Sequence, residues 1–124
     1  MDDDETLHGD ADFCPANATL DLLGRPWTLH IVRSLLGGKM RFNEIARELR
    51  LNPSTLRERL RALEDECVVG RTVVSTMPPN VEYELTEKGL ALNCIFGALS
   101  DWGRTWMRPP GSEAEPPASA PPPQ

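Results

Sequence analysis

Short hydroxyl and long cationic side chains share one face of a predicted helix at residues 52–67. Four other side chains recur there at helical spacing and form an apolar stripe: Leu56, Leu60, Leu63 and Cys67. The opposite side carries Ser54, Arg57, Glu58 and Arg61, with Thr55 on the flank. Hydroxyl and guanidinium groups hydrogen-bond to phosphates and base edges, so this face suits a helix that enters the major groove of DNA. The alternative is an ordinary amphipathic helix with a solvated charged face.

Two charged residues of this helix have more than one interpretation. Glu58 either accepts a hydrogen bond from a cytosine amino group or pairs on the surface with Arg57 or Arg61. Arg59 lies nearer the apolar flank, where it either braces the fold or contacts a backbone phosphate. Both are therefore candidate DNA contacts with a structural alternative.

The segments before this helix predict a helix-turn-helix. Residues 42–49 form a helix with one apolar face, and residues 50–52 are a tight link in which Leu51 fills the angle between the helices. Asn52 is a favourable N-cap and Pro53 suits the first helical position, so the second helix has a defined start. Two short helices with such a turn are typical of DNA-binding proteins. Two residues at the start of the first helix join the candidate DNA contacts: Arg41 and Asn43.

The rest of the chain predicts a wing and three further helices. The predicted helices cover residues 15–24, 26–36 and 86–106, and the predicted strands cover residues 40–42, 69–75 and 81–85. A hairpin directly after a reading helix is a wing, so the expected fold is mainly α with a small β-hairpin (α+β), a winged helix-turn-helix. Arg71 and Asn80 of the wing are candidate contacts to the adjacent minor groove or to phosphates. Their alternative is a plain exposed hairpin.

Charge is distributed unevenly along the 124 residues, whose formal net charge is -6. Residues 1–12 hold six acids and no Lys or Arg, which accounts for the whole net charge. Residues 25–61 hold nine Lys or Arg against three Glu, a local charge of +6, and such a segment attracts phosphates. Residues 1–12 and the proline-rich residues 108–124 are expected to be disordered tails on one domain at residues 13–107.

Other classes of protein are disfavoured. No apolar run is long enough to span a membrane and the acidic N-terminus is unlike a signal peptide, so a soluble cytoplasmic protein is expected. The three cysteines form no CxxC pair or Cys/His cluster, which argues against a metal site. The sequence has no glycine-rich phosphate loop or nucleophile constellation, so we expect neither an enzyme nor a bound cofactor.

The cysteines have different predicted surroundings. Cys14 precedes Pro15 at a helix N-terminus, where partial positive charge stabilises a thiolate, although nearby aspartates oppose ionisation. The alternative for Cys14 is a small buried hydrophobic side chain. Cys67 occupies an apolar position and is predicted to lie in the core. Cys94 lies off the main stripe of the last helix and is predicted to be exposed.

The predicted last helix has more apolar surface than so short a chain can readily bury. Its large apolar side chains follow helical spacing: Leu92, Ile95, Phe96, Leu99, Trp102 and Trp106. A helix from a second subunit is the expected cover, with packing inside one chain as the alternative. Leu20 and Leu23 of the first predicted helix are expected to complete this dimer interface. Such a dimer would set two reading helices about 34 Å apart, one turn of B-DNA.

Taken together, these segments resemble the HxlR family of bacterial winged-helix transcription regulators, relatives of the MarR group. The resemblance covers residues 13–104, and its matching stretches are CP at 14–15, LGRPWTLHIVRSLL at 23–36, RFNEI at 41–45, PSTL at 53–56, RLRALE at 59–64, MPP at 77–79, VEY at 81–83 and LTEKG at 85–89. This chain departs from the family pattern at two places. Arg25-Pro26 stands where Gly-Lys is usual before Trp27, and Asn80 stands in the wing where a basic residue is common.

The resemblance implies a homodimer that binds a pseudopalindromic operator in double-stranded DNA. It also implies that some members sense oxidants or reactive electrophiles through the cysteine equivalent to Cys14. The sequence thus predicts a dimeric, sequence-specific DNA-binding transcriptional regulator, with a small electrophile or oxidant as a candidate effector. The alternative is a winged-helix module that binds proteins and has lost DNA binding, which the acidic N-terminus and Asn80 favour.

Overall fold

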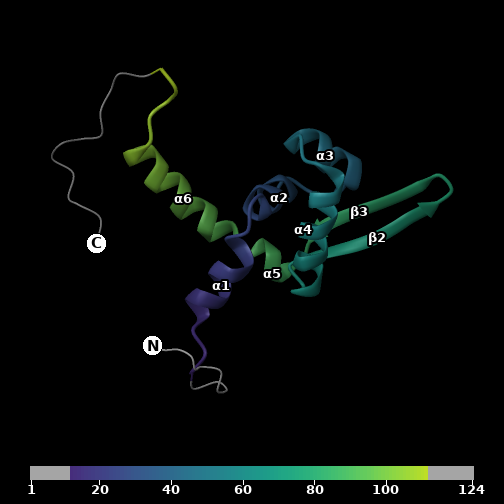
Figure 1. Cartoon of the computed structure of the whole chain (residues 1–124), viewed down its shortest axis with the longest axis horizontal. Coiled ribbons are helices and arrows are strands. Elements are labelled where there is room, and N and C mark those ends of the chain that lie inside the picture. The colour runs from purple at the N-terminus through teal and green to yellow at the C-terminus, as the bar shows by residue number, and fades with distance from the viewer. Residues whose placement is uncertain (1–11, 112–124) are drawn as a thin grey trace.

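A computed structural model describes residues 12–111, and Figure 1 shows how its elements are arranged. The elements in chain order are α1 (Pro15–Leu23), α2 (Thr28–Leu35), β1 (Met40–Arg41), α3 (Phe42–Leu49), α4 (Pro53–Asp65), β2 (Val69–Thr76), β3 (Pro79–Leu85), α5 (Glu87–Leu90) and α6 (Asn93–Trp106). Helices α1 and α6 extend from one side of the body, and the β2–β3 hairpin projects from the other (Figure 1). The predicted tails lie almost wholly outside the described residues. Within residues 12–111, no helix combines the length and the apolar character that a membrane crossing needs.

The strands form an antiparallel sheet in the order β1-β3-β2. The predicted short strand joins the hairpin, with Met40 opposite Tyr83. Along the hairpin the register shifts between Val73 and Ser75, which leaves an irregularity near its outer end. Because β1 leads directly into α3, the sheet holds the start of the helix-turn-helix against the wing.

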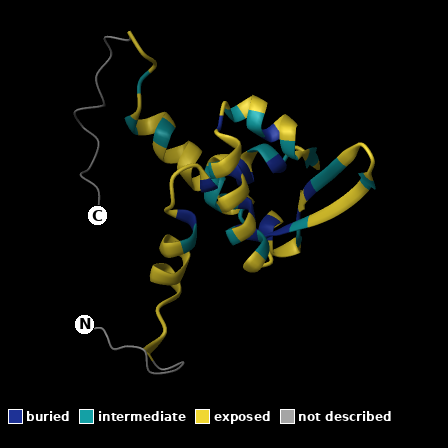
Figure 2. Ribbon diagram, turned by 45° about the vertical axis from the view of Figure 1, so that its right-hand side comes forward, coloured by how far each residue is buried: buried dark blue, intermediate teal, exposed yellow. Residues whose placement is uncertain are grey.

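The core lies where α2, α3 and α4 meet the base of the sheet (Figure 2). Its buried residues are Ile31, Val32, Leu35, Ile45, Leu51, Leu56, Leu60, Leu63, Val68, Val69, Tyr83 and Leu85. The predicted leucine stripe of α4 is confirmed, and so is the burial of Leu51 in the link. Burying one such side chain contributes about 1.5–3 kcal/mol, so the stripe fixes which face of α4 remains in solvent.

The second helix starts later than predicted. It begins at Thr28 and not at Pro26, because Trp27 adopts a left-handed backbone with φ of 73°. The preceding turn is closed by the Thr28 amide, which donates to the Arg25 carbonyl at 3.2 Å. Trp27 is 41% exposed and lies beside His30, with ring centroids 5.0 Å apart. Trp27 therefore stands outside the helix that was predicted to include it.

Helix α4 ends at Asp65, and the prediction that Cys67 lies in the core is wrong. The Cys67 amide donates to the Glu64 carbonyl and the Val68 amide donates to the Leu63 carbonyl, both at 2.9 Å. These two bonds close the helix in a Schellman motif, which requires a left-handed residue at its end. Cys67 is that residue, with φ of 62°, and its side chain is exposed. Val68 takes the buried position instead.

The predicted last helix is broken into α5 and α6. Thr86 caps α5, since its hydroxyl oxygen accepts a hydrogen bond from the Gly89 amide at 3.2 Å. Leu92 packs against the core, and its own amide donates to the Gly89 carbonyl at 3.0 Å in a tighter turn. This turn redirects the chain, so α6 leaves the body and none of its residues is buried.

We expect Gly89→Ala to destabilise the fold and Gly97→Ala to leave it intact. A Cβ at position 89 would collide with the Val68 carbonyl oxygen and lie 3.0 Å from the Leu85 Cδ2 atom, whereas a Cβ at position 97 meets nothing within 4 Å. Such overpacking costs about 1–3 kcal/mol, and an alanine at an open helical position gains about 0.5–1 kcal/mol. Urea unfolding of both variants measures the two effects. Equal unfolding midpoints would contradict the close packing at Gly89.

Candidate nucleic-acid interface

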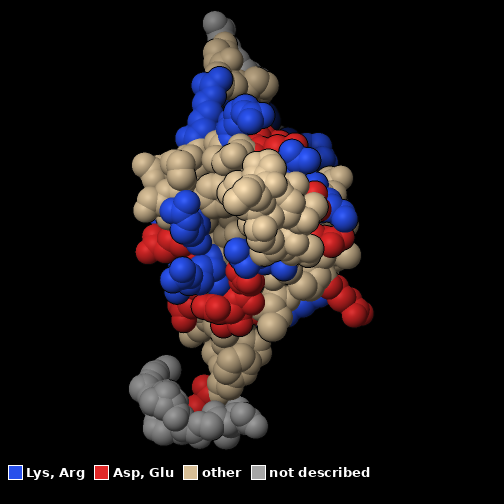
Figure 3. Space-filling view, turned by 90° about the vertical axis from the view of Figure 1, so that its right-hand side faces the viewer, with Lys and Arg blue, Asp and Glu red and all other residues tan. Residues whose placement is uncertain are grey.

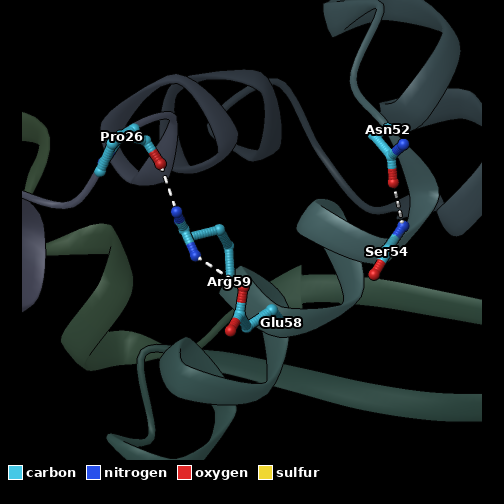
Figure 4. Close-up of polar contacts among 5 residues, drawn as sticks. All are labelled: Pro26, Asn52, Ser54, Glu58 and Arg59. Carbon is cyan, nitrogen blue, oxygen red and sulfur yellow. Dashed lines mark hydrogen bonds and ion pairs between the residues drawn. The ribbon is translucent and has the colours of Figure 1, made fainter.

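Helix α4 presents the predicted polar face to solvent. Its start is fixed by Asn52, whose side-chain oxygen accepts a hydrogen bond from the Ser54 amide at 2.7 Å (Figure 4). Ser54, Arg57, Glu58 and Arg61 are exposed, and Thr55 is half-buried. Because the opposite stripe of leucines is buried, the hydroxyl and guanidinium groups stand on a helix that cannot rotate.

Backbone hydrogen bonds fix the turn between α3 and α4. Arg50 adopts a left-handed conformation with φ of 53°, and its amide donates to the Arg47 carbonyl at 3.3 Å. The Leu51 amide donates to the Ala46 carbonyl at 3.0 Å, so α3 ends in the same motif as α4. The predicted tight link is confirmed, and it holds the two helices as one unit.

Five predicted DNA contacts line one hollow between α3, α4 and the hairpin, with a volume of about 590 Å³. They are Arg41, Asn43, Arg57, Arg71 and Asn80. Arg41 and Asn43 reach the hollow because β1 pairs with β3, and Arg71 and Asn80 come from the two strands of the wing. Residues that are distant in sequence thus share one concave surface with three guanidinium groups.

A second hollow of about 280 Å³ continues this surface along α4. It is lined by Arg57, Arg61, Glu64, Arg71 and Tyr83. Arg57 and Arg71 belong to both hollows, so we refer to Arg41, Arg57, Arg61 and Arg71 together as the arginine surface. Four guanidinium groups around adjoining hollows attract a polyanion, and Glu64 is the acid among the residues that line them.

Arg57 is held in place by an aromatic ring from the preceding helix. Its guanidinium carbon lies 5.3 Å from the centroid of the Phe42 ring. Phe42 in turn lies beside the buried Tyr83, with centroids 6.5 Å apart. A cation–π contact at an exposed site contributes about 0.5–1 kcal/mol and limits the rotamers of the arginine. Helical spacing alone places Phe42 on an apolar face, and no local signal pairs it with Arg57.

Arg59 braces the fold, which is one of its two predicted roles. Its Nε donates to the Pro26 carbonyl at 2.8 Å, and one terminal nitrogen contacts the Glu58 carboxylate at 3.1 Å (Figure 4). The Arg59 side chain is only 17% exposed, whereas that of Glu58 is 74% exposed. The expected surface pairing of Glu58 with Arg57 or Arg61 is therefore wrong, because the Glu58 carboxylate pairs with Arg59.

The predicted dimer residues divide into three groups by exposure. Leu20, Leu99 and Trp102 are 66%, 50% and 55% exposed. Leu23 is buried and belongs to the packing of its own subunit. The remaining residues of the predicted interface are half-buried: Leu92, Ile95, Phe96 and Trp106. Much of the apolar surface of α1 and α6 therefore has no cover within residues 12–111.

All three cysteines are free and exposed. Cys14 is the N-cap residue of α1 and its side chain makes no capping hydrogen bond, so the buried alternative does not hold within the subunit. Cys94 is exposed as predicted, with its thiol 3.4 Å from the Ala91 carbonyl oxygen. A groove of about 720 Å³ begins at Phe13 and Pro15, the neighbours of Cys14, and runs between α1, α5 and the last turn of α4.

Comparison with known proteins gives consistent matches over the described region. A model of the HxlR-like helix-turn-helix family matches residues 22–110. The HTH-type transcriptional regulator YvaP of Bacillus subtilis (strain 168) is 42% identical over 101 residues, which cover 80% of this chain and 94% of YvaP. The reduced form of the transcriptional regulator YodB from B. subtilis has a TM-score of 0.69 at 35% identity, covering 81% of this chain and 99% of that chain. The redox regulator HypR in its oxidized form has a TM-score of 0.67 at 38% identity. The match covers 73% of this chain and 95% of that chain.

Proposed function

We propose that this chain, which belongs to the HxlR-like helix-turn-helix family, regulates transcription as a homodimer bound to a pseudopalindromic operator in double-stranded DNA. Its relatives YvaP and YodB are transcriptional regulators. The observation that carries the proposal is the arginine surface, which combines the exposed face of a capped helix with the wing. Such a surface neutralises phosphates and leaves guanidinium groups to bind base edges.

The proposed mechanism places α4 in the major groove. Ser54 and Thr55 in its first turn contact phosphates or base edges, and Arg57 and Arg61 bind guanine or phosphate. Contacts from the wing and from the start of α3 fix the register of the protein on the duplex. A second copy of the chain pairs with the first through α1 and α6 about a twofold axis. Its own α4 then lies about 34 Å away, in the major groove one helical turn further along the same face of the duplex.

Selection of bound duplexes from a random DNA pool tests this proposal. We expect inverted half-sites whose centres are about 10 base pairs apart. Binding should weaken steeply with salt, with a slope of about -0.9 in log K against log salt for each phosphate neutralised. Failure to bind any duplex at low salt would contradict the proposal and favour a protein-interaction module.

We infer that an oxidant or small electrophile acts at Cys14 and controls operator binding. The exposed thiol at the start of α1 supports this, as does the groove beside it, which joins α1 to the last turn of α4. HypR, with the same fold, is a redox regulator. An adduct on the Cys14 sulfur would change how α1 packs against α4 and against a second subunit, and hence the spacing of the two reading helices.

Replacing Cys14 with serine should abolish the response of operator binding to an electrophile such as a quinone. The controls are Cys67→Ser and Cys94→Ser, because all three thiols are free and exposed and lie in different parts of the fold. We expect both controls to lose affinity on treatment as the wild type does. Fluorescence anisotropy with labelled operator, before and after treatment, measures the response. An unchanged response in Cys14→Ser removes this cysteine from the mechanism.

A further inference from the structure

The outer end of the hairpin exposes apolar side chains and carries no charged residue. Val73, Val74 and Met77 are 48%, 51% and 91% exposed, and we call these three residues the wing tip. No Lys or Arg occurs between Arg71 and Lys88. In Figure 3 the hairpin end faces the viewer, and an uncharged area fills the centre with charged side chains around it. The wing tip therefore cannot hold phosphates by charge.

The turn next to the wing tip reaches the arginine surface. The turn residues Pro78, Pro79 and Asn80 line the same hollow as Arg41 and Arg57. The Ser75 hydroxyl donates to the Pro78 carbonyl and ties the turn together. A duplex that lies on the arginine surface therefore also runs along the end of the hairpin.

The hairpin is long enough to reach the next groove. Met77 follows Arg71 by six residues. At about 3.3 Å per residue, an extended strand spans roughly 20 Å over this interval. Neighbouring major and minor grooves lie half a helical turn apart, about 17 Å. With α4 in the major groove and Arg71 at its edge, the wing tip falls at the adjacent minor groove.

We propose that Met77 enters this minor groove as an apolar wedge that partly unstacks one base step and bends the duplex. The inference rests on the proposed DNA-binding function and adds DNA deformation to it. Minor-groove proteins commonly insert Met, Pro or other apolar side chains between base steps. Pyrimidine–purine steps open most easily, so the wing tip selects such steps without a hydrogen bond to any base. This mode compensates for the lack of a basic residue at Asn80.

The test uses full-length protein and the duplexes recovered by random selection. Dyes at the two duplex ends report bending, and 2-aminopurine at the step facing the wing reports unstacking. The wild type and Met77→Leu, which keeps apolar bulk, are expected to shorten the end-to-end distance and raise the 2-aminopurine fluorescence. Met77→Ser is expected to leave the duplex straight. Its affinity should stay within about tenfold of the wild type, because the variant loses the favourable contacts of Met77 but is also spared the cost of unstacking a base step. Met77 is 91% exposed, so neither change disturbs the fold.

Equal bending by the wild type and Met77→Ser overturns the proposal. A second result also overturns it. If Met77→Ser bends the duplex but two dimers no longer bind cooperatively to a longer duplex, the wing tip contacts the neighbouring dimer and not the DNA. A second selection with Met77→Ser should lose the preference for pyrimidine–purine steps at the wing and keep the preferences under α4. If the wild type binds no duplex at low salt, the proposed function itself fails, and this is seen before any variant is compared.

Discussion

Replacing Arg57 or Arg61 with alanine should weaken binding to the selected operator by at least about 30-fold. A bidentate contact between arginine and a base contributes about 1–3 kcal/mol of discrimination. Each change occurs twice in a dimer, so the expected loss is about 2–6 kcal/mol, and the lower limit corresponds to about 30-fold. Both side chains are exposed, so Arg61→Ala should hardly change thermal stability, and Arg57→Ala should lose only the contribution of its contact with Phe42, about 0.5–1 kcal/mol. Anisotropy titrations with the operator measure the loss.

The pattern of loss distinguishes base contacts from phosphate contacts. If Arg57 reads a base, selection with Arg57→Ala should relax the preference at one symmetric pair of positions and keep the others. If it holds a phosphate, all sequences should weaken alike and the salt slope should fall by about 2 per dimer. The contact with Phe42 favours the first outcome, because a guanidinium held at 5.3 Å from a ring presents its donors in few orientations.

Lys88→Ala is the matched control for these two variants. Lys88 is an exposed cation on α5, 3.8 Å from the Glu66 carboxylate and outside both hollows of the arginine surface. Removing it changes the net charge of the protein as much as removing either arginine. We expect its operator affinity to stay within about threefold of the wild type, since an exposed ion pair contributes at most about 1 kcal/mol. An equal loss in all three variants would mean that overall charge, and not the arginine surface, governs binding.

The parts of the fold that follow from local sequence were predictable. Helix α4 has leucines at helical spacing and a capping Asn52 before Pro53, and these features alone set its start and its buried face. Its end was not predictable, because the left-handed residue that closes it is Cys67, where glycine is the usual signal. The break after Leu90 was not predictable either, because Gly89 stands in a run that keeps helical spacing on both sides and the turn forms as Leu92 packs on the core.

The candidate site also has a part that local sequence predicts and a part that it does not. The outward face of α4 follows from its periodicity, but the concave surface depends on strand pairing between β1 and β3, which local patterns do not encode. Local sequence could not decide the role of Arg59, because its place on the helix suited both a phosphate contact and a contact that braces the fold. A hydrogen bond to the Pro26 carbonyl, 33 residues away, assigns it to bracing. Contacts of that sequence separation form only when the whole domain packs.

Replacing both Leu99 and Trp102 with glutamate should convert the protein to a monomer. These side chains lie on one side of α6 and are 50% and 55% exposed within a single subunit. A contiguous apolar face of this kind marks a contact surface, and two charges placed in it would be buried without partners in a dimer. Sedimentation equilibrium measures the mass, and circular dichroism checks that the helices remain.

Arg104→Glu is the control for the double variant. Arg104 is on the same helix but about 140° from the centre of the apolar face, where it pairs with Asp101. The Arg104→Glu substitution introduces a glutamate into α6 outside the expected interface, so the protein should remain a dimer. A double variant that still sediments as a dimer, or a wild type that sediments as a monomer, would contradict the proposed use of α6.

Loss of the dimer should lower affinity for the full operator without changing how each subunit reads DNA. Two linked half-sites bind more tightly than one by a factor of about 10²–10⁴, so the double variant should lose an amount in this range. On a duplex that carries one half-site, however, it should bind as tightly as one subunit of the wild type, because α4 and the wing are untouched. Weaker binding to the half-site as well would show that the changes on α6 damage the reading domain. Equal half-site affinity with a lost full-operator advantage would assign α6 to pairing two copies of the arginine surface.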